Sequence, residues 1–131
     1  MPSQAWEYDA GMDVRACISQ PEIIRPGETK MIPIGLIFEL SEPGWEIQFR
    51  SRSGLAAKSG IHILNSPGTI DYLYREQCQA ILHNAGSNVF VVNPGDRIGQ
   101  ICVREVPQVT LERVEAAEKT ARSGFGSTGV R

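Results

Sequence analysis

The chain has 131 residues, with 15 acidic and 13 basic side chains, and its formal net charge is −2 at pH 7. This length predicts one domain with its own hydrophobic core, and the slightly acidic balance argues against a general nucleic-acid-binding surface. No apolar run approaches the length of a membrane span, and the N-terminus lacks the pattern of a signal peptide, so we expect a cytoplasmic protein that binds neither nucleic acid nor membrane.

Short strands separated by Pro-Gly pairs are predicted through the first half of the chain. Residues 12–18 carry apolar side chains at the even positions, which is typical of a strand with one buried face. In residues 30–40, a proline and a glycine favour a strand with an edge or a bulge over a helix. Residues 45–50 alternate cleanly. Repeated turns between short strands indicate an all-β sandwich or barrel, and the Pro-Gly pairs lie at 26–27, 43–44, 67–68 and 94–95.

Helix-forming residues gather only in residues 51–58. Ser53 fits the N-cap position, so we expect a short helix to begin there. The exposed N–H groups of a helix start suit an anion, and Arg52 adds a charge with bidentate geometry. Taken alone, this segment is explained as well by an ordinary capped turn with a surface arginine.

Residues 61–74 contain an apolar run, a chain reversal and a β-branched return. Pro67 presets its own φ and Gly68 accepts a positive φ, which predicts a hairpin carrying Asn65 on one arm and Asp71 and Tyr74 on the other. A carboxylate close to an amide and an aromatic ring could act as a base beside a planar ligand. The local sequence alone favours the simpler interpretation, a surface hairpin with a solvated aspartate.

Further strands are predicted at residues 77–84, 88–92, 97–103 and 109–114, followed by a loosely helical segment at 115–120. The glycine-rich residues after it cannot hold a fixed fold alone. We therefore expect a β domain at 1–119 and a flexible arm at 120–131. The arm holds an arginine, an aromatic residue and hydroxyls that could fold over a nucleotide.

The three cysteines, Cys17, Cys78 and Cys102, are widely spaced and have apolar neighbours. They lack the paired spacing of a zinc site and are interpreted as buried, reduced thiols, as expected in a reducing cytoplasm. Neither His62 nor His83 lies in a motif with a cysteine, so a catalytic cysteine is not predicted.

Five segments, in this order, resemble motifs of the trimeric dUTPase family, which splits dUTP into dUMP and pyrophosphate. They are Ala10-Gly11-Met12-Asp13-Val14-Arg15-Ala16, Arg52-Ser53-Gly54-Leu55-Ala56-Ala57-Lys58, the segment from Asn65 to Tyr74, Pro94-Gly95-Asp96-Arg97-Ile98-Gly99-Gln100 and Gly124-Phe125-Gly126-Ser127-Thr128-Gly129. The resemblance implies a jelly-roll-like β fold, a homotrimer whose active sites combine motifs of different subunits, and Mg²⁺ as cofactor.

The resemblance also implies roles for individual residues. Asp71 would be the general base that activates water. Asn65 would bind the uracil edge and Tyr74 would pack on the deoxyribose. The phosphates would be bound by Arg52, Ser53, Gly54 and Gln100. Asp13 would lie near the metal, mainly through water. The C-terminal arm would close over the nucleotide through Arg122, Phe125, Gly126, Ser127 and Thr128.

The chain departs from the family pattern at Ser51, where proline is usual, at Leu73, where a second aspartate is usual, and at Glu76, where glycine is usual. Because Leu73 replaces this aspartate, Arg97 lacks the acidic partner that is usual in the family and would pair with Glu76 or Asp96 instead. Two alternatives therefore stay open. One is an enzyme like dCTP deaminase, which has a similar Pro-Gly…Arg-Ile-Gly stretch. The other is a catalytically weak, nucleotide-binding regulatory protein on the same fold.

Overall fold

The computed structural model describes residues 1–116 and 118. Among the residues described, no helix is long and apolar enough to span a membrane. The described part of the chain contains short strands and one helix, α1 (Ser53–Ser59). The strands are β1 (Met12–Arg15), β2 (Glu22–Ile24), β3 (Thr29–Pro33), β4 (Trp45–Arg50), β5 (Ile61–Ile63), β6 (Gly68–Ile70), β7 (Gln79–Asn84), β8 (Phe90–Val92) and β9 (Arg97–Glu105).

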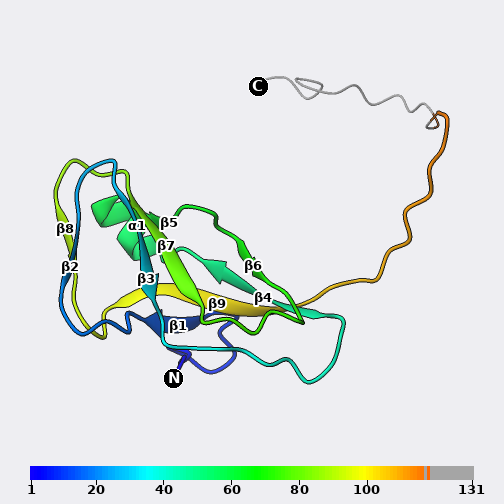
Figure 1. Cartoon of the computed structure of the whole chain (residues 1–131), viewed down its shortest axis with the longest axis horizontal. Coiled ribbons are helices and arrows are strands. Elements are labelled where there is room, and N and C mark those ends of the chain that lie inside the picture. Colours follow the sequence, from blue (N-terminus) through cyan, green and yellow to red (C-terminus); the bar gives the residue numbers. More distant parts are fainter. Residues whose placement is uncertain (117, 119–131) are drawn as a thin grey trace.

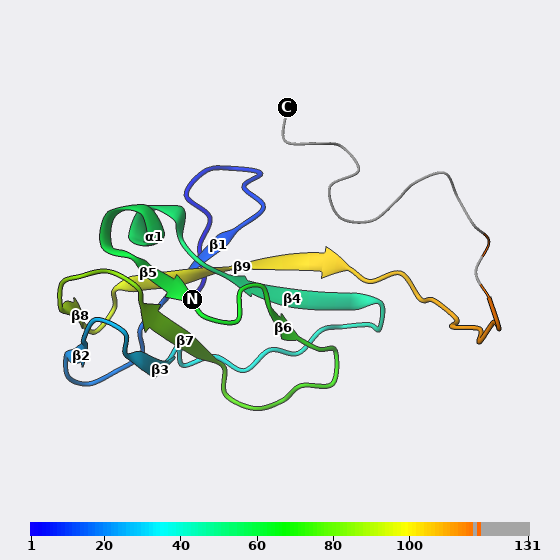
Figure 2. The same cartoon turned by 90° about the horizontal axis from the view of Figure 1, so that it is seen from above.

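The strands form three antiparallel sheets, in the orders β1-β9-β4-β6, β3-β7-β5 and β2-β8. Figures 1 and 2 show these sheets gathered into one body, with α1 at one end and the segment after β9 running away from it. The architecture is therefore all-β with one short helix, as the sequence predicts. Strand β9 pairs with both β1 and β4, which brings the first and the last of the described strands into one sheet.

The core lies between the sheets and is built by the alternation visible in the sequence. Ile47 and Phe49 of β4 are buried, and Phe49 faces the buried Ile101 of β9 in the register. Val14 and Ala16 are buried, as predicted for the even positions of residues 12–18, although β1 itself ends at Arg15. Each large aliphatic side chain buried in this way contributes about 1.5–3 kcal/mol.

The predicted hairpin at residues 61–74 is wrong. β5 pairs with β7, and β6 pairs with β4, so the reversal at residues 64–67 links two different sheets. Gly68 lies in β6 and is not among the glycines with positive φ. The local signals for a reversal were correct, but the partner of each strand depends on residues far away in the sequence.

Three further expectations are corrected. The N-cap of α1 is Arg52, whose carbonyl oxygen accepts from the N–H groups of Leu55 and Ala56, and the cap has no side-chain hydrogen bond, so Ser53 is the first helical residue. Cys17 is exposed because it lies on the face of the chain opposite Val14 and Ala16. Residues 109–114 form no strand, since no segment among the residues that the structure describes pairs with them.

Candidate functional site

A cluster of charged and amide side chains lies where β1, β9 and the start of α1 meet. We call Asp13, Arg52, Arg97 and Gln100 the cationic cluster. Asp13 faces Gln100 in the register of β1 and β9, and Arg97 is the first residue of β9. Arg52 reaches this point because it caps α1 directly after β4. Segments that are 84 residues apart in the chain are thereby joined at one point.

Asp13 bridges the two arginines of the cationic cluster. Its Oδ1 lies 3.1 Å from Nε of Arg52, and its Oδ2 lies 3.2 Å from Nη1 of Arg97. Arg52 also donates through Nη1 to the carbonyl oxygen of Arg97 at 2.9 Å. Two guanidinium groups share one carboxylate, so the cluster has an excess positive charge and suits a polyanion. The sequence predicted Glu76 or Asp96 as the partner of Arg97, and this prediction is wrong. The pairing of β1 with β9 places the Asp13 carboxylate beside Arg97 instead.

Gln100 is held against the backbone of this cluster. Its Nε2 donates to the carbonyl oxygen of Ser51 at 3.0 Å. A Cβ atom added at Gly11 would lie only 2.2 Å from Oε1 of Gln100. Gly11 is therefore required for the position of the Gln100 amide, a role that the sequence did not reveal because it arises from a contact between distant segments.

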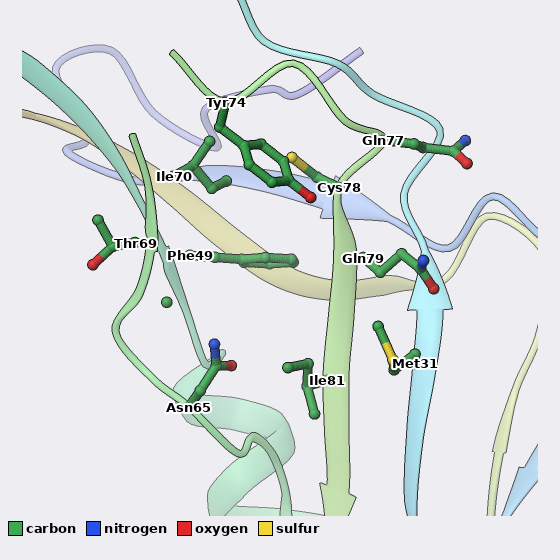
Figure 3. Close-up of a pocket in the computed structure, with 11 residues that line it drawn as sticks. Met31, Phe49, Asn65, Thr69, Ile70, Tyr74, Gln77, Cys78, Gln79 and Ile81 are labelled. Carbon is green, nitrogen blue, oxygen red and sulfur yellow. The ribbon is translucent and has the colours of Figure 1, made fainter. Parts of the chain in front are cut away.

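A pocket of about 210 Å³ lies beside β6 and β7 (Figure 3). Asn65 and Tyr74 lie at opposite ends of it, with the ring of Phe49 between them. Ile70 and Cys78 line the same space, and the remaining lining residues are Met31, Gly68, Thr69, Gln77, Gln79 and Ile81. The pocket is apolar in the middle with amides at its edge, an arrangement that suits a flat, polar-edged ring.

Two details shape this pocket. A Cβ atom at Gly68 would lie 3.0 Å from Nδ2 of Asn65, so the glycine lets the amide approach the backbone of β6.

Burial raises the pKa of the Cys78 thiol above its ordinary value of 9.0, so the sulfur stays protonated at neutral pH. Cys78 therefore contributes an apolar wall and no nucleophile.

Asp71 lies in the exposed turn that follows β6, between the pocket residues Ile70 and Tyr74. The N–H of Tyr74 donates to the carbonyl oxygen of Asp71 at 3.0 Å, which closes the turn. Arg75 braces it by donating through Nη1 to the carbonyl oxygens of Tyr72 and Tyr74. Asp71 is therefore an exposed residue on a braced turn, directly after the pocket residue Ile70 in the sequence.

The structure therefore divides the predicted site residues into two groups. Asp13, Arg52 and Gln100 meet in the cationic cluster, with Ser53 and Gly54 exposed beside it at the start of α1. Asn65 and Tyr74 meet in the pocket, and none of the pocket's lining residues belongs to the cluster. The predicted arm residues, Arg122, Phe125, Gly126, Ser127 and Thr128, lie outside the described residues.

No group of three or more histidine, cysteine, aspartate or glutamate side chains that could hold a metal ion occurs in the described ranges. Oδ2 of Asp13 accepts from Arg97 and Oδ1 forms an ion pair with Arg52, which leaves further lone pairs for water. A role for Asp13 beside a hydrated cation thus fits the geometry, whereas a cage made of protein ligands does not.

The model of the dUTPase family matches residues 1–129 of the chain. Among curated relatives, the deoxyuridine 5'-triphosphate nucleotidohydrolase of Rickettsia bellii is 46% identical over 99% of this chain and 87% of its own length. The enzyme of the same name from Chlamydia muridarum is 47% identical over 98% of this chain and 90% of its own length.

Solved structures show the same fold. A mutant dUTPase of Staphylococcus bacteriophage 80alpha, with dUpNHpp, has a TM-score of 0.85 and 22% identity, covering 99% of this chain and 92% of that one. A mutant dUTPase from phage phi11 of S. aureus, described with a structural Mg(II) ion, has a TM-score of 0.79 and 21% identity, covering 91% and 92%. These likenesses establish the jelly-roll-like fold, and the match of the family model over residues 1–129 shows that the chain belongs to the dUTPase family.

Proposed function

We propose that this chain hydrolyses dUTP to dUMP and pyrophosphate by attack of water on the α-phosphorus. The observation that carries the proposal is the pocket of Asn65 and Tyr74, with Asp71 exposed on the braced turn that follows the pocket residue Ile70. The names of the relatives from Rickettsia bellii and Chlamydia muridarum describe the same substrate. Asp71 acts as the general base that orients the attacking water and takes its proton.

The pocket selects the nucleoside. Asn65 and the backbone of β6 bind the uracil edge, and Gly68 allows that backbone to come close enough to leave no space for the methyl group of thymine. Tyr74, half-exposed at the other end of the pocket, packs on the deoxyribose and leaves no room for a 2′-hydroxyl. Cytosine presents a reversed donor pattern, and the loss of a required hydrogen bond in a dry site discriminates strongly.

The cationic cluster binds the triphosphate. Arg52 and Gln100 donate to phosphate oxygens, and Ser53 and Gly54 lie beside them at the start of α1. Charge that develops on the leaving pyrophosphate is stabilised by these preplaced donors. Asp13 keeps Arg52 oriented for this contact.

The cofactor we propose is Mg²⁺, held mainly by phosphate oxygens and water, as this ion prefers. When bound, it neutralises and aligns the triphosphate. Asp13 is the residue that would accept hydrogen bonds from its water ligands, through lone pairs not used by the two arginines.

We further propose a homotrimer in which each site combines the pocket of one subunit with the cationic cluster of another. The pocket and the cationic cluster share no residue, which supports this arrangement. So does the segment after β9, which leaves the body with Val109, Leu111 and Val114 exposed. The β domain would span residues 1–119 and the arm 120–131 would close over the site of a neighbour. Free cysteines are consistent with a cytoplasmic protein.

A substrate panel tests the proposed function. Pyrophosphate release is measured with dUTP, UTP, dTTP and dCTP at equal concentration in the presence of Mg²⁺, and ammonia release from dCTP is measured in parallel. We expect release from dUTP alone. Ammonia from dCTP would favour the deaminase alternative, and nucleotide binding without turnover would favour the regulatory one. Asn65→Ala should weaken selectivity for uracil, with Thr69→Ala as a control on the same pocket wall.

A further inference from the structure

A row of polar side chains crosses the face of the β3-β7-β5 sheet opposite the buried Leu82. Thr29 faces His83 in the register of β3 and β7, and His62 faces His83 in the register of β5 and β7. Both histidines are half-buried, and their ring centroids lie 5.3 Å apart with the planes at 72°. Neither histidine lines the pocket or belongs to the cationic cluster.

One nitrogen of each ring is already engaged. Nδ1 of His62 lies 3.3 Å from the carbonyl oxygen of Gly60, and since a carbonyl only accepts, this nitrogen carries the proton and Nε2 keeps its lone pair. Nδ1 of His83 lies 3.0 Å from Oγ1 of Thr29, a hydroxyl that can accept from this nitrogen or donate to it. When the hydroxyl accepts, Nε2 of His83 also keeps its lone pair. Across the residues that the structure describes, neither Nε2 atom has a hydrogen-bond partner.

Neutral imidazoles with a free Nε2 are ligands that Zn²⁺, Ni²⁺ and Cu²⁺ prefer. A metal-binding histidine usually donates its other ring N–H to an oxygen. His62 has this arrangement with the carbonyl oxygen of Gly60, and the contact of His83 with the Thr29 hydroxyl allows it. Two imidazoles, each about 2.0–2.1 Å from a tetrahedral ion, have ring centroids about 5.2 Å apart. The observed separation of 5.3 Å matches this spacing.

We propose that His62 and His83 bind one divalent transition-metal ion per chain through their Nε2 atoms, with water completing its coordination. The bound ion links β5 to β7 directly before the chain enters the pocket at Asn65. Nitrogen ligands distinguish this site from that of Mg²⁺, which takes oxygen ligands. The proposal does not depend on dUTP hydrolysis, because it uses residues outside both groups of the candidate site.

Calorimetric titration of Zn²⁺ into the full-length chain without a histidine tag tests the proposal. The parent carries Cys17→Ser, because the exposed thiol of Cys17 is itself a zinc ligand. We expect one Zn²⁺ per chain, no equivalent binding of Mg²⁺, and loss of zinc binding in His62→Gln and in His83→Gln. Thr29→Val should weaken zinc binding about tenfold, because it removes the oxygen that orients His83.

Thermal unfolding gives a second readout and shows that each variant is folded. Zinc should raise the Tm of the parent and leave the Tm of His62→Gln unchanged. If His83→Gln does not fold, zinc binding by His62→Gln alone tests the proposal. The proposal is overturned if the parent binds no zinc, or if His62→Gln binds zinc as the parent does. An unchanged affinity in Thr29→Val overturns the role given to Thr29.

Discussion

Asp13 and Arg52, which lie 39 positions apart in the sequence, form an ion pair in which Oδ1 of the carboxylate is 3.1 Å from Nε of the guanidinium. Only about a fifth of the Asp13 side chain is exposed, and its second oxygen pairs with Arg97. Asp13 is therefore a positioning residue for the arginine that binds phosphate in the proposed mechanism, in addition to any contact with metal-bound water.

Asp13→Asn tests this positioning. The amide keeps the shape of the side chain but loses its charge, so Arg52 is held less firmly. Exposed ion pairs contribute about 0.2–1 kcal/mol, and hydrogen bonds to charged groups about 1.5–3 kcal/mol. For this partly buried pair we expect kcat/KM for dUTP to fall about tenfold, which is about 1.4 kcal/mol. Glu39→Gln removes the same charge from an exposed site, and an equal fall in that control would contradict the interpretation.

Gly11→Ala should impair the same cluster through Gln100. The added Cβ would meet Oε1 of Gln100 at 2.2 Å and push the amide away from the carbonyl oxygen of Ser51. We expect a lower kcat/KM for dUTP with the unfolding free energy changed by less than about 1.5 kcal/mol, since the end of a side chain can move. The decisive comparison is a double-mutant cycle. In a Gln100→Ala background, Gly11→Ala should have almost no further effect on kcat/KM, and additive losses would exclude the contact as the cause.

Several strands, turns and buried positions of this chain could be predicted from local sequence patterns. The alternation of Trp45–Arg50 predicted β4 with the bounds it has, because side chains of a half-buried strand repeat every two residues. The turns at three of the Pro-Gly pairs, 26–27, 43–44 and 94–95, and the position of the helix followed from local backbone preferences. The even positions of residues 12–18 correctly predicted the burial of Val14 and Ala16.

Strand partners could not be predicted, because they depend on register between distant segments. The partner of Arg97 was assigned to Glu76 or Asp96, whereas the pairing of β1 with β9 places Asp13 there. The contact of Gly11 with Gln100 arises from the same pairing. Residues 109–114 carry strand-like side chains, but nothing in the described part of this chain pairs with them.

Asn84 should be the polar side chain on which stability depends most. It is fully buried, and its Nδ2 donates to the carbonyl oxygens of Ile24 and Asn88, while its Oδ1 accepts from the N–H of Gly86. Asn84→Ala leaves three backbone groups without this partner, so we expect the unfolding free energy to fall by about 2–4 kcal/mol. Urea denaturation measures it. Asn88→Ala is the matched control and should change stability by less than about 0.5 kcal/mol.

Stability should fall in alkaline solution partly because of Cys78. Its pKa is raised by burial above the ordinary value of 9.0 that applies in the unfolded chain. Above pH 9 the unfolded chain loses the thiol proton while the folded chain keeps it, so the unfolding free energy decreases as pH rises towards the folded-state pKa. Below pH 9 this group has no effect. Cys78→Val should flatten this part of the curve, measured by urea denaturation between pH 8 and pH 10. An identical slope in both proteins would contradict the assignment.

The most direct test of the central claim is single-turnover pyrophosphate release from dUTP by the chain and by Asp71→Asn, with binding of the analogue dUpNHpp measured for both. The account predicts release by the parent chain, a loss of several orders of magnitude in Asp71→Asn, and nearly equal binding of the analogue. Rapid release by a folded Asp71→Asn would contradict the role of Asp71 as the base. A folded parent that binds dUpNHpp but releases no pyrophosphate from dUTP would contradict the proposed function itself.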